Sequence, residues 1–218
     1  MAGRKIKDFT ARPCNQGGIS VEKKYTSNIK NMPFLFLEMK RTAVFLVDGK
    51  TKEEILALST EQNVYQLEKE QRRRELPLKM LARLSTLNNE LVKVVAVGNE
   101  YEAKLVSFFA MMKTDRLLFE YMLEVYADRH RVGVLEINDR DYEEFIDRKI
   151  QNSETVAKWK TNNLVKVRTA IKSTLVNAGL AKRSGSNLEV LPPIVDKNFI
   201  NMFDYQDGIY IKAMLLPS

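Results

Sequence analysis

Apolar residues recur every three or four positions over much of the chain, which is the spacing of one face of an α-helix. The longest such stripe contains Leu78, Leu81, Leu84, Leu87, Leu91, Val94 and Val95. Two further stripes follow, one over residues 105–112 and one over 118–126. This much aliphatic surface at helical spacing predicts an all-α bundle over about residues 30–130.

Proline and capping residues divide these stripes into separate helices. Pro33 suits the first turn of a helix. Thr51 and Glu54 form a capping-box pattern, in which the threonine hydroxyl accepts from the backbone N–H of Glu54 and the glutamate carboxylate accepts in return. Pro77 lies in a charged, helix-prone segment, and it predicts a break or a new helix start near Leu76 because proline lacks an N–H and clashes with the preceding turn.

The pattern changes at Gly133, where a short β-branched run over residues 134–137 predicts one strand. We therefore place a domain boundary near residues 131–134. The expected parts are a basic flexible arm over residues 1–24, a helical bundle over 25–132, and a smaller domain with a C-terminal extension over 133–218.

The second half predicts the outline of a winged helix-turn-helix. Ser153 can cap a short helix, and Thr161 can cap a longer one whose apolar residues repeat at threes and fours. Gly179 fits the left-handed position after that helix. Residues 180–191 then predict a hairpin with a basic strand and a Gly-containing turn. The expected fold is thus mainly α, an N-terminal helical bundle followed by a winged helix with a small β-hairpin wing.

The composition narrows the possible partners. A formal net charge of +7 favours polyanions, with nucleic acid first and an acidic membrane surface second. No apolar run reaches the length of about 20 residues that a bilayer-spanning helix needs, and the N-terminal segment lacks the apolar run of a secretory signal. The single cysteine rules out an internal disulfide and a cysteine-based zinc site. We expect a cytoplasmic protein.

Motifs for catalysis are missing from the sequence. The single histidine, His130, lies between two arginines at a predicted helix end and has no ligand-spaced partners for a metal. Neither glycine-rich phosphate-binding pattern, G-x-x-x-x-G-K-[ST] or G-x-G-x-x-G, occurs. The expectation is a protein without enzymatic activity, cofactor or metal.

One cluster of basic residues is more informative. Between Glu154 and Arg183 there are seven Lys or Arg residues and one acidic residue, whereas a solvated helix normally mixes both signs. Polar residues that can contact phosphates or base edges accompany them. The candidate DNA-binding residues are Lys158, Lys160, Asn162, Asn163, Lys166, Arg168, Thr169, Lys172, Lys182 and Arg183. A solvated or protein-binding face is the alternative, since many winged-helix domains bind proteins.

A second basic cluster, Arg72, Arg73 and Arg74, is a possible further DNA contact. It stands beside Glu68, Glu70 and Glu75, so ion pairs within one helix are the alternative interpretation.

The order of several landmarks resembles the BrxA family, the small component of bacterial BREX phage-defence systems. They are FLFLEMKRTA (34–43), NVYQ (63–66), Arg73-Arg74, Arg83-Leu84, DRLLFEYMLEV (115–125), Phe145, Trp159 and AGL (178–180). The resemblance covers about residues 25–205. It rests on order and spacing, because none of these motifs is specific by itself.

The resemblance implies a mostly helical, cytoplasmic protein without enzymatic activity that binds DNA beside other BREX components. Together with the basic helix and hairpin, it leads us to expect double-stranded DNA as the ligand. It also implies a helical bundle similar to that of NusB over residues 30–130. Two other functions stay open at this point: an adaptor that docks another protein on the same surface, and RNA binding through the helical bundle. The sequence predicts neither the oligomeric state nor a preferred DNA sequence.

Overall fold

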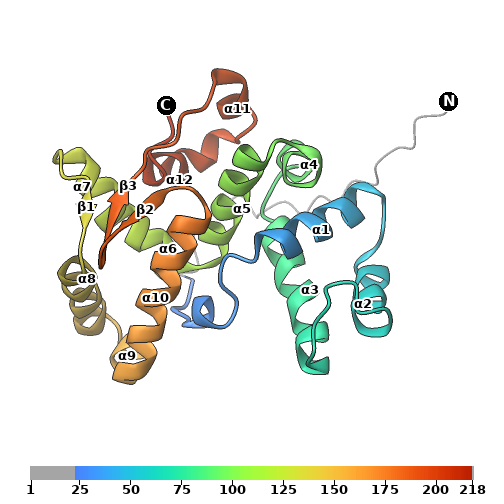
Figure 1. Ribbon diagram of the computed structural model, residues 1–218, viewed down its shortest axis with the longest axis horizontal. Helices are drawn as coiled ribbons and strands as arrows, with labels where there is room; N and C mark the ends of the chain where they lie inside the picture. Colours follow the sequence, from blue (N-terminus) through green and yellow to red (C-terminus); the bar gives the residue numbers. More distant parts are fainter. Residues whose placement is uncertain (1–22, 218) are drawn as a thin grey trace, which may run out of the picture. The chain divides into compact units, whose positions relative to one another are not determined.

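The computed structural model describes residues 23–217, which form mostly helices with one small antiparallel sheet (Figure 1). The described residues divide into two compact units. The first comprises residues 35–110, and the second combines residues 23–34 with residues 111–217. The arm expected over residues 1–24 lies outside the described residues except for its last two.

The first unit consists of helices. They are α1 (Phe36–Val47), α2 (Lys52–Glu61), α3 (Glu70–Leu84), α4 (Asn89–Val97) and most of α5 (Glu100–Thr114). Helix α1 packs on α3 and α4, and α2 packs on α3. The capping box predicted at Thr51 and Glu54 is confirmed, and Gly98 ends α4 as expected.

Two expectations for helix boundaries in this unit are wrong. Helix α1 starts at Phe36, after Leu35 in a left-handed conformation, so Pro33 is not in its first turn. The other concerns Pro77, described below. The stripe from Leu78 to Val95 belongs to two helices, because Asn88 caps α4 by accepting from the backbone N–H of Leu91 at 2.9 Å.

Pro77 does not break the chain, because α3 continues through it from Glu70 to Leu84. A proline in a helix leaves the carbonyl four residues earlier without its usual N–H partner. Here that carbonyl belongs to Arg73, and the hydroxyl of the fully buried Ser59 on α2 donates to it at 2.6 Å. The tertiary contact replaces the lost hydrogen bond, and Pro77 is buried.

The second unit combines helices with the sheet. Its helices are η1 (Asn28–Lys30), the end of α5, α6 (Arg116–Tyr121), the π-helical turn η2 (Met122–Tyr126), α7 (Ala127–Arg131), α8 (Asp139–Asn152), α9 (Glu154–Ala157), α10 (Thr161–Asn177), α11 (Lys197–Asn201), η3 (Tyr205–Asp207) and α12 (Gly208–Ala213). The boundary expected near residues 131–134 falls inside this unit, because η2 packs on α8 and α12.

The predicted strand and hairpin are present. Strands β1 (Glu136–Ile137), β2 (Ala181–Ser184) and β3 (Asn187–Val190) form an antiparallel sheet in the order β1-β3-β2. Ala181 pairs with Val190 and Ile137 with Leu188, and all four side chains are buried. The sheet therefore has an apolar face, which is held within the core of this unit.

Tyr126, in η2, fixes both ends of the hairpin. Its ring is fully buried, and its hydroxyl lies 2.8 Å from the carbonyl oxygen of Leu180 and 3.0 Å from that of Leu191. These two carbonyls stand just before β2 and just after β3. The hydroxyl therefore holds the base of the hairpin against the helix that precedes β1.

Tyr126→Phe is expected to lower the free energy of unfolding by about 1 kcal/mol, because the change keeps the ring but removes the hydroxyl that donates to the carbonyls of Leu180 and Leu191, and the Leu180 carbonyl retains the backbone N–H of Leu191 as a donor. Urea denaturation measures this difference. Tyr205→Phe is the matched control, because Tyr205 is fully exposed. We expect a control change below about 0.5 kcal/mol. Equal effects of the two substitutions would contradict the role given to Tyr126.

None of the helices within residues 23–217 combines the length and the apolar character that a bilayer-spanning helix requires.

Candidate nucleic-acid interface

Helix α10 has a buried face and an exposed face. It begins after Lys160, so the expected cap at Thr161 is wrong, and it ends before Gly179, whose φ of 77° confirms the predicted left-handed position. The buried face contains Val167, Ala170, Ile171, Thr174 and Leu175. The exposed face contains Asn162, Val165, Lys166 and Thr169. The apolar spacing thus turns one polar stripe toward solvent, as the sequence predicted.

Two candidate residues of α10 face acidic partners instead of solvent. Lys172 Nζ lies 2.5 Å from a carboxylate oxygen of Asp139, and an Arg168 guanidinium nitrogen lies 3.4 Å from Asp139 and 3.4 Å from Glu143. Both acids belong to α8. The hydrogen bond from the Lys172 ammonium holds the pKa of Asp139 below its usual range, so this carboxylate is ionised at neutral pH. These two basic groups are largely compensated inside the protein.

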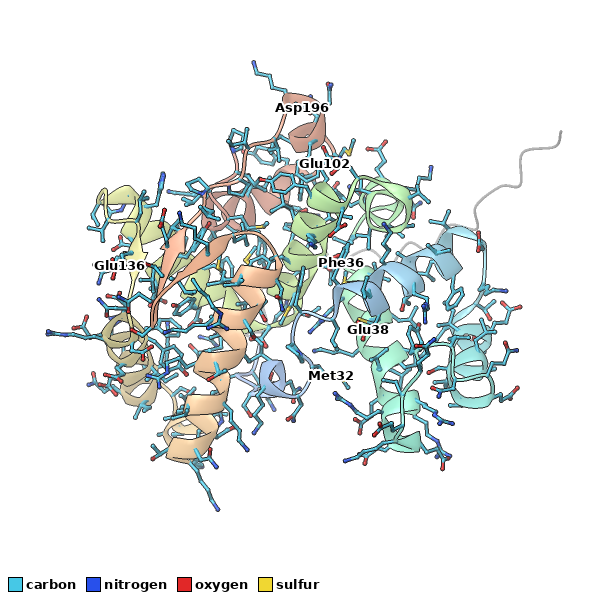
Figure 2. All side chains as sticks on the ribbon, in the orientation of Figure 1. Met32, Phe36, Glu38, Glu102, Glu136 and Asp196 are labelled. Atoms are coloured by element: carbon cyan, nitrogen blue, oxygen red, sulfur yellow. The ribbon has the colours of Figure 1, made fainter. Side chains whose placement is uncertain are left out.

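The hairpin also contains one basic residue with an acidic partner and one without. Lys182 Nζ pairs with Glu189 on β3 at 2.9 Å, and Lys172 Nζ donates at 2.7 Å to the carbonyl oxygen of Ser186 in the turn. Glu136 on β1, labelled in Figure 2, accepts from the Asn187 side-chain amide. The hairpin is therefore fastened to α10 and to β1. Arg183 is exposed.

Five cations of this region are exposed, and all except Lys182, which pairs with Glu189, are available to a partner: Lys158, Lys160, Lys166 and Arg183. Lys158 lies 3.9 Å from Glu154, but both side chains are more than three quarters exposed, so this pair contributes little. The Thr169 hydroxyl donates to the carbonyl of Val165 at 3.0 Å, which leaves its oxygen able to accept. The candidate site is reduced to the outer face of α10, the residues before its first turn and one arginine of the hairpin.

A segment far away in the sequence lies beside this surface. Helix η1 packs on α10, and the Lys30 ammonium donates to the Asn163 side-chain oxygen. Lys30, Asn31 and Pro33 form one wall of a shallow groove whose other wall is Val165, Lys166, Thr169, Ala170 and Ser173. Sequence reasoning missed this neighbour, because 133 positions separate Lys30 from Asn163 and no local pattern connects them.

The second basic cluster lies on α3, in the first unit. Arg74 pairs with Glu70 at 2.5 Å across one helical turn, and Arg73 Nε donates at 2.8 Å to the carbonyl oxygen of Leu67. Arg72 is half-buried and also has a partner. The ion pair within one helix that the sequence offered as the alternative is present for Arg74. This cluster presents less free charge than its sequence suggests.

No other group of chemically active residues emerges from the described part of the chain. Within residues 23–217, no three His, Cys, Asp or Glu side chains gather in a way that suits a metal ion. His130 is exposed at the end of α7. Cys14 lies outside the described residues.

Comparison with known proteins identifies the family. A family model described as BrxA matches residues 23–207. The chain belongs to the BrxA family. This confirms the resemblance seen in the order of sequence landmarks, and the match includes α10, the hairpin and the segment around η1.

One similar protein agrees with this assignment to the BrxA family, and one solved structure shares the fold. A protein named BREX protein BrxA, from Bacillus cereus (strain H3081.97), is 32% identical over 195 residues, which is 89% of this chain and 98% of that protein. A solved crystal structure of an uncharacterized protein from Magnetospirillum magneticum superimposes with a TM-score of 0.74, covering 88% of this chain and 98% of the other. That structure is 18% identical, so it supports the fold alone.

Proposed function

We propose that this BrxA-family protein binds double-stranded DNA through the outer face of α10 and the β2–β3 hairpin. The observation that supports the proposal is the separation of charges around α10. Arg168 and Lys172 turn to the acids of α8, while Lys166 stays exposed beside Asn162 and Thr169. A helix that offers free basic and amide groups on one face suits a negatively charged groove.

The arrangement of elements supports a winged helix-turn-helix. Strand β1, helices α8 and α10, and then β2 and β3 follow one another, and β3 lies between the other two strands (Figure 1). In this architecture the second helix enters the major groove. The hairpin forms the wing, and its exposed Arg183 is available for a phosphate. Lys172 holds the wing to α10 through the Ser186 carbonyl, so it positions the wing and does not contact DNA itself.

The biological setting follows from the similar B. cereus protein, which is named a BREX protein. We infer that this chain is an accessory component of a bacterial BREX phage-defence system. It works in the cytoplasm beside the other components and has no enzymatic activity of its own. Its task is to hold DNA, so the chemistry of defence belongs to its partners.

Affinity for duplex DNA is expected to fall steeply with salt. Four exposed cations (Lys158, Lys160, Lys166 and Arg183) are available for phosphates. Neutralising about four phosphates gives a slope of log K against log salt between about −3 and −5. Fluorescence anisotropy with a labelled duplex of about 25 base pairs, repeated at several salt concentrations, measures it.

A salt response near zero would contradict the proposal and favour a protein partner on this surface. Tighter binding of an RNA duplex of the same sequence would favour the RNA alternative. A pull-down from cells that express all components of the BREX system, with and without nuclease, separates contacts mediated by DNA from direct contacts with another BREX component.

A further inference from the structure

The first unit contains an apolar pocket that the proposed DNA interface does not use. Its walls come from the second halves of α1 and α3 and from the beginning of α4. They include Leu46, Val47, Leu81, Leu84, Leu87 and Val92. The pocket offers about 90 Å³ of space. An apolar cavity of about 150 Å³ accommodates benzene, so this one has room for a single aliphatic side chain and not for a cofactor.

The lining of this pocket includes positive charge. Lys50 and Lys93 line it, and neither ammonium has an ion-pair partner among residues 23–217. Thr51, the N-cap of α2, and Asn89, the first residue of α4, line it as well. The partial positive charges of these helix starts add to the field of the two lysines. No acidic residue of the described chain is among the lining residues.

We propose that this pocket docks an acidic segment of a partner protein, which inserts one aliphatic side chain between α1, α3 and α4. The pocket supplies apolar burial for that side chain, and Lys50 and Lys93 supply charge complementarity for carboxylates on either side of it. Double-stranded DNA fits the charge but has no aliphatic group to bury. A basic segment fits the apolar part but is repelled by the lysines. The protein therefore has a docking site for a partner in addition to its proposed DNA surface.

The test uses the full-length protein and three labelled synthetic peptides of about ten residues. The first contains one leucine flanked on both sides by aspartate and glutamate, the second has alanine in place of leucine, and the third has lysine in place of the acids. We expect the first peptide to bind about tenfold or more tightly than each of the others. Amide chemical shifts that move on binding should cluster at residues 46–51 and 87–93.

Two variants locate the binding. Lys50→Glu/Lys93→Glu is expected to weaken binding of the acidic peptide about tenfold or more, because it reverses the charge of the pocket lining. Val92→Trp is expected to weaken binding of the same peptide by filling the pocket without changing its charge. Lys69→Glu/Lys197→Glu is the matched control, because it reverses the same number of charges at two exposed lysines that do not line the pocket. The proposal is overturned by the absence of binding at millimolar peptide, by equal affinity for the leucine and alanine peptides, or by unchanged binding in Lys50→Glu/Lys93→Glu.

Discussion

Lys160→Glu/Lys166→Glu/Arg183→Glu is expected to bind duplex DNA about a hundredfold more weakly than the unmodified protein at the same salt concentration. Each of the three residues is exposed, and together they span the start of α10, its outer face and the hairpin. Every phosphate contact that is removed weakens binding and lowers the magnitude of the salt slope by about one. The slope should therefore fall by about three in the variant. Anisotropy titrations at several salt concentrations measure both quantities.

The control must change the net charge by the same amount as this triple variant and must leave the proposed surface intact. Lys69→Glu/Lys197→Glu/Lys212→Glu reverses three exposed lysines, one directly before α3 and the others on α11 and α12. Because long-range attraction depends on total charge, this control separates the general field of the protein from contact at one surface. We expect less than a tenfold loss of affinity in the control. Equal losses in both triple variants would show that α10 and the hairpin are not the interface.

The structure changes which substitutions test the DNA proposal. The candidate list from the sequence included Arg168 and Lys172, but these side chains are bound to Asp139 and Glu143. Reversing their charge would place like charges together between α10 and α8 and would release the wing from Lys172. A loss of DNA binding in such a variant would report a disturbed fold. Charge reversal avoids this disturbance at the exposed residues Lys160, Lys166 and Arg183.

Local patterns in the sequence predicted local structure well. The caps at Thr51 and Ser153 and the left-handed Gly179 depend on groups within four residues of one another, so the linear pattern contains the information needed. The β2–β3 hairpin is likewise a local feature that the sequence predicted. The effect of Pro77 is not local, because its helix continues through a hydrogen bond from Ser59, on another helix.

Non-local pairing explains what the sequence could not predict about the site. The one-sign charge of residues 158–183 is real, yet its compensation comes from α8 and from Glu189 on β3. Burial decides which cations stay free, and burial depends on how helices pack. The groove beside η1 has the same origin, since Lys30 reaches Asn163 only after folding. The family resemblance could be recognised because it follows chain order, which needs no tertiary information.

Lys149→Met is expected to lower the free energy of unfolding by about 2–3 kcal/mol. The Lys149 side chain is 11% exposed, and its ammonium lies 2.6 Å from Glu120 on α6 and 2.5 Å from Glu124 on η2. Tyr25 donates to Glu120 at 2.7 Å, and Arg116 also pairs with it at 2.7 Å. Methionine keeps the packing volume but leaves two half-buried carboxylates with less compensation, and breaking a buried pair from one side costs several kcal/mol. Chemical denaturation at neutral pH measures the loss.

The matched control is Arg148→Met, because Arg148 pairs with the same Glu124 at 3.5 Å but is 50% exposed. We expect this substitution to lower the free energy of unfolding by less than about 1 kcal/mol.

Acid unfolding gives an independent test of the role of Lys149. Burial acts to raise the pKa of Glu120, but hydrogen bonds from Lys149, Arg116 and Tyr25 outweigh it and hold the pKa below the ordinary 4.5. A lowered pKa stabilises the fold above about pH 4.5, and this contribution is lost as the pH falls through the folded value. Without Lys149 the pKa of Glu120 moves back toward its ordinary value, so the stability of Lys149→Met should fall less steeply below pH 4.5. An acid dependence as steep as that of the unmodified protein would mean that Lys149 does not stabilise the Glu120 carboxylate.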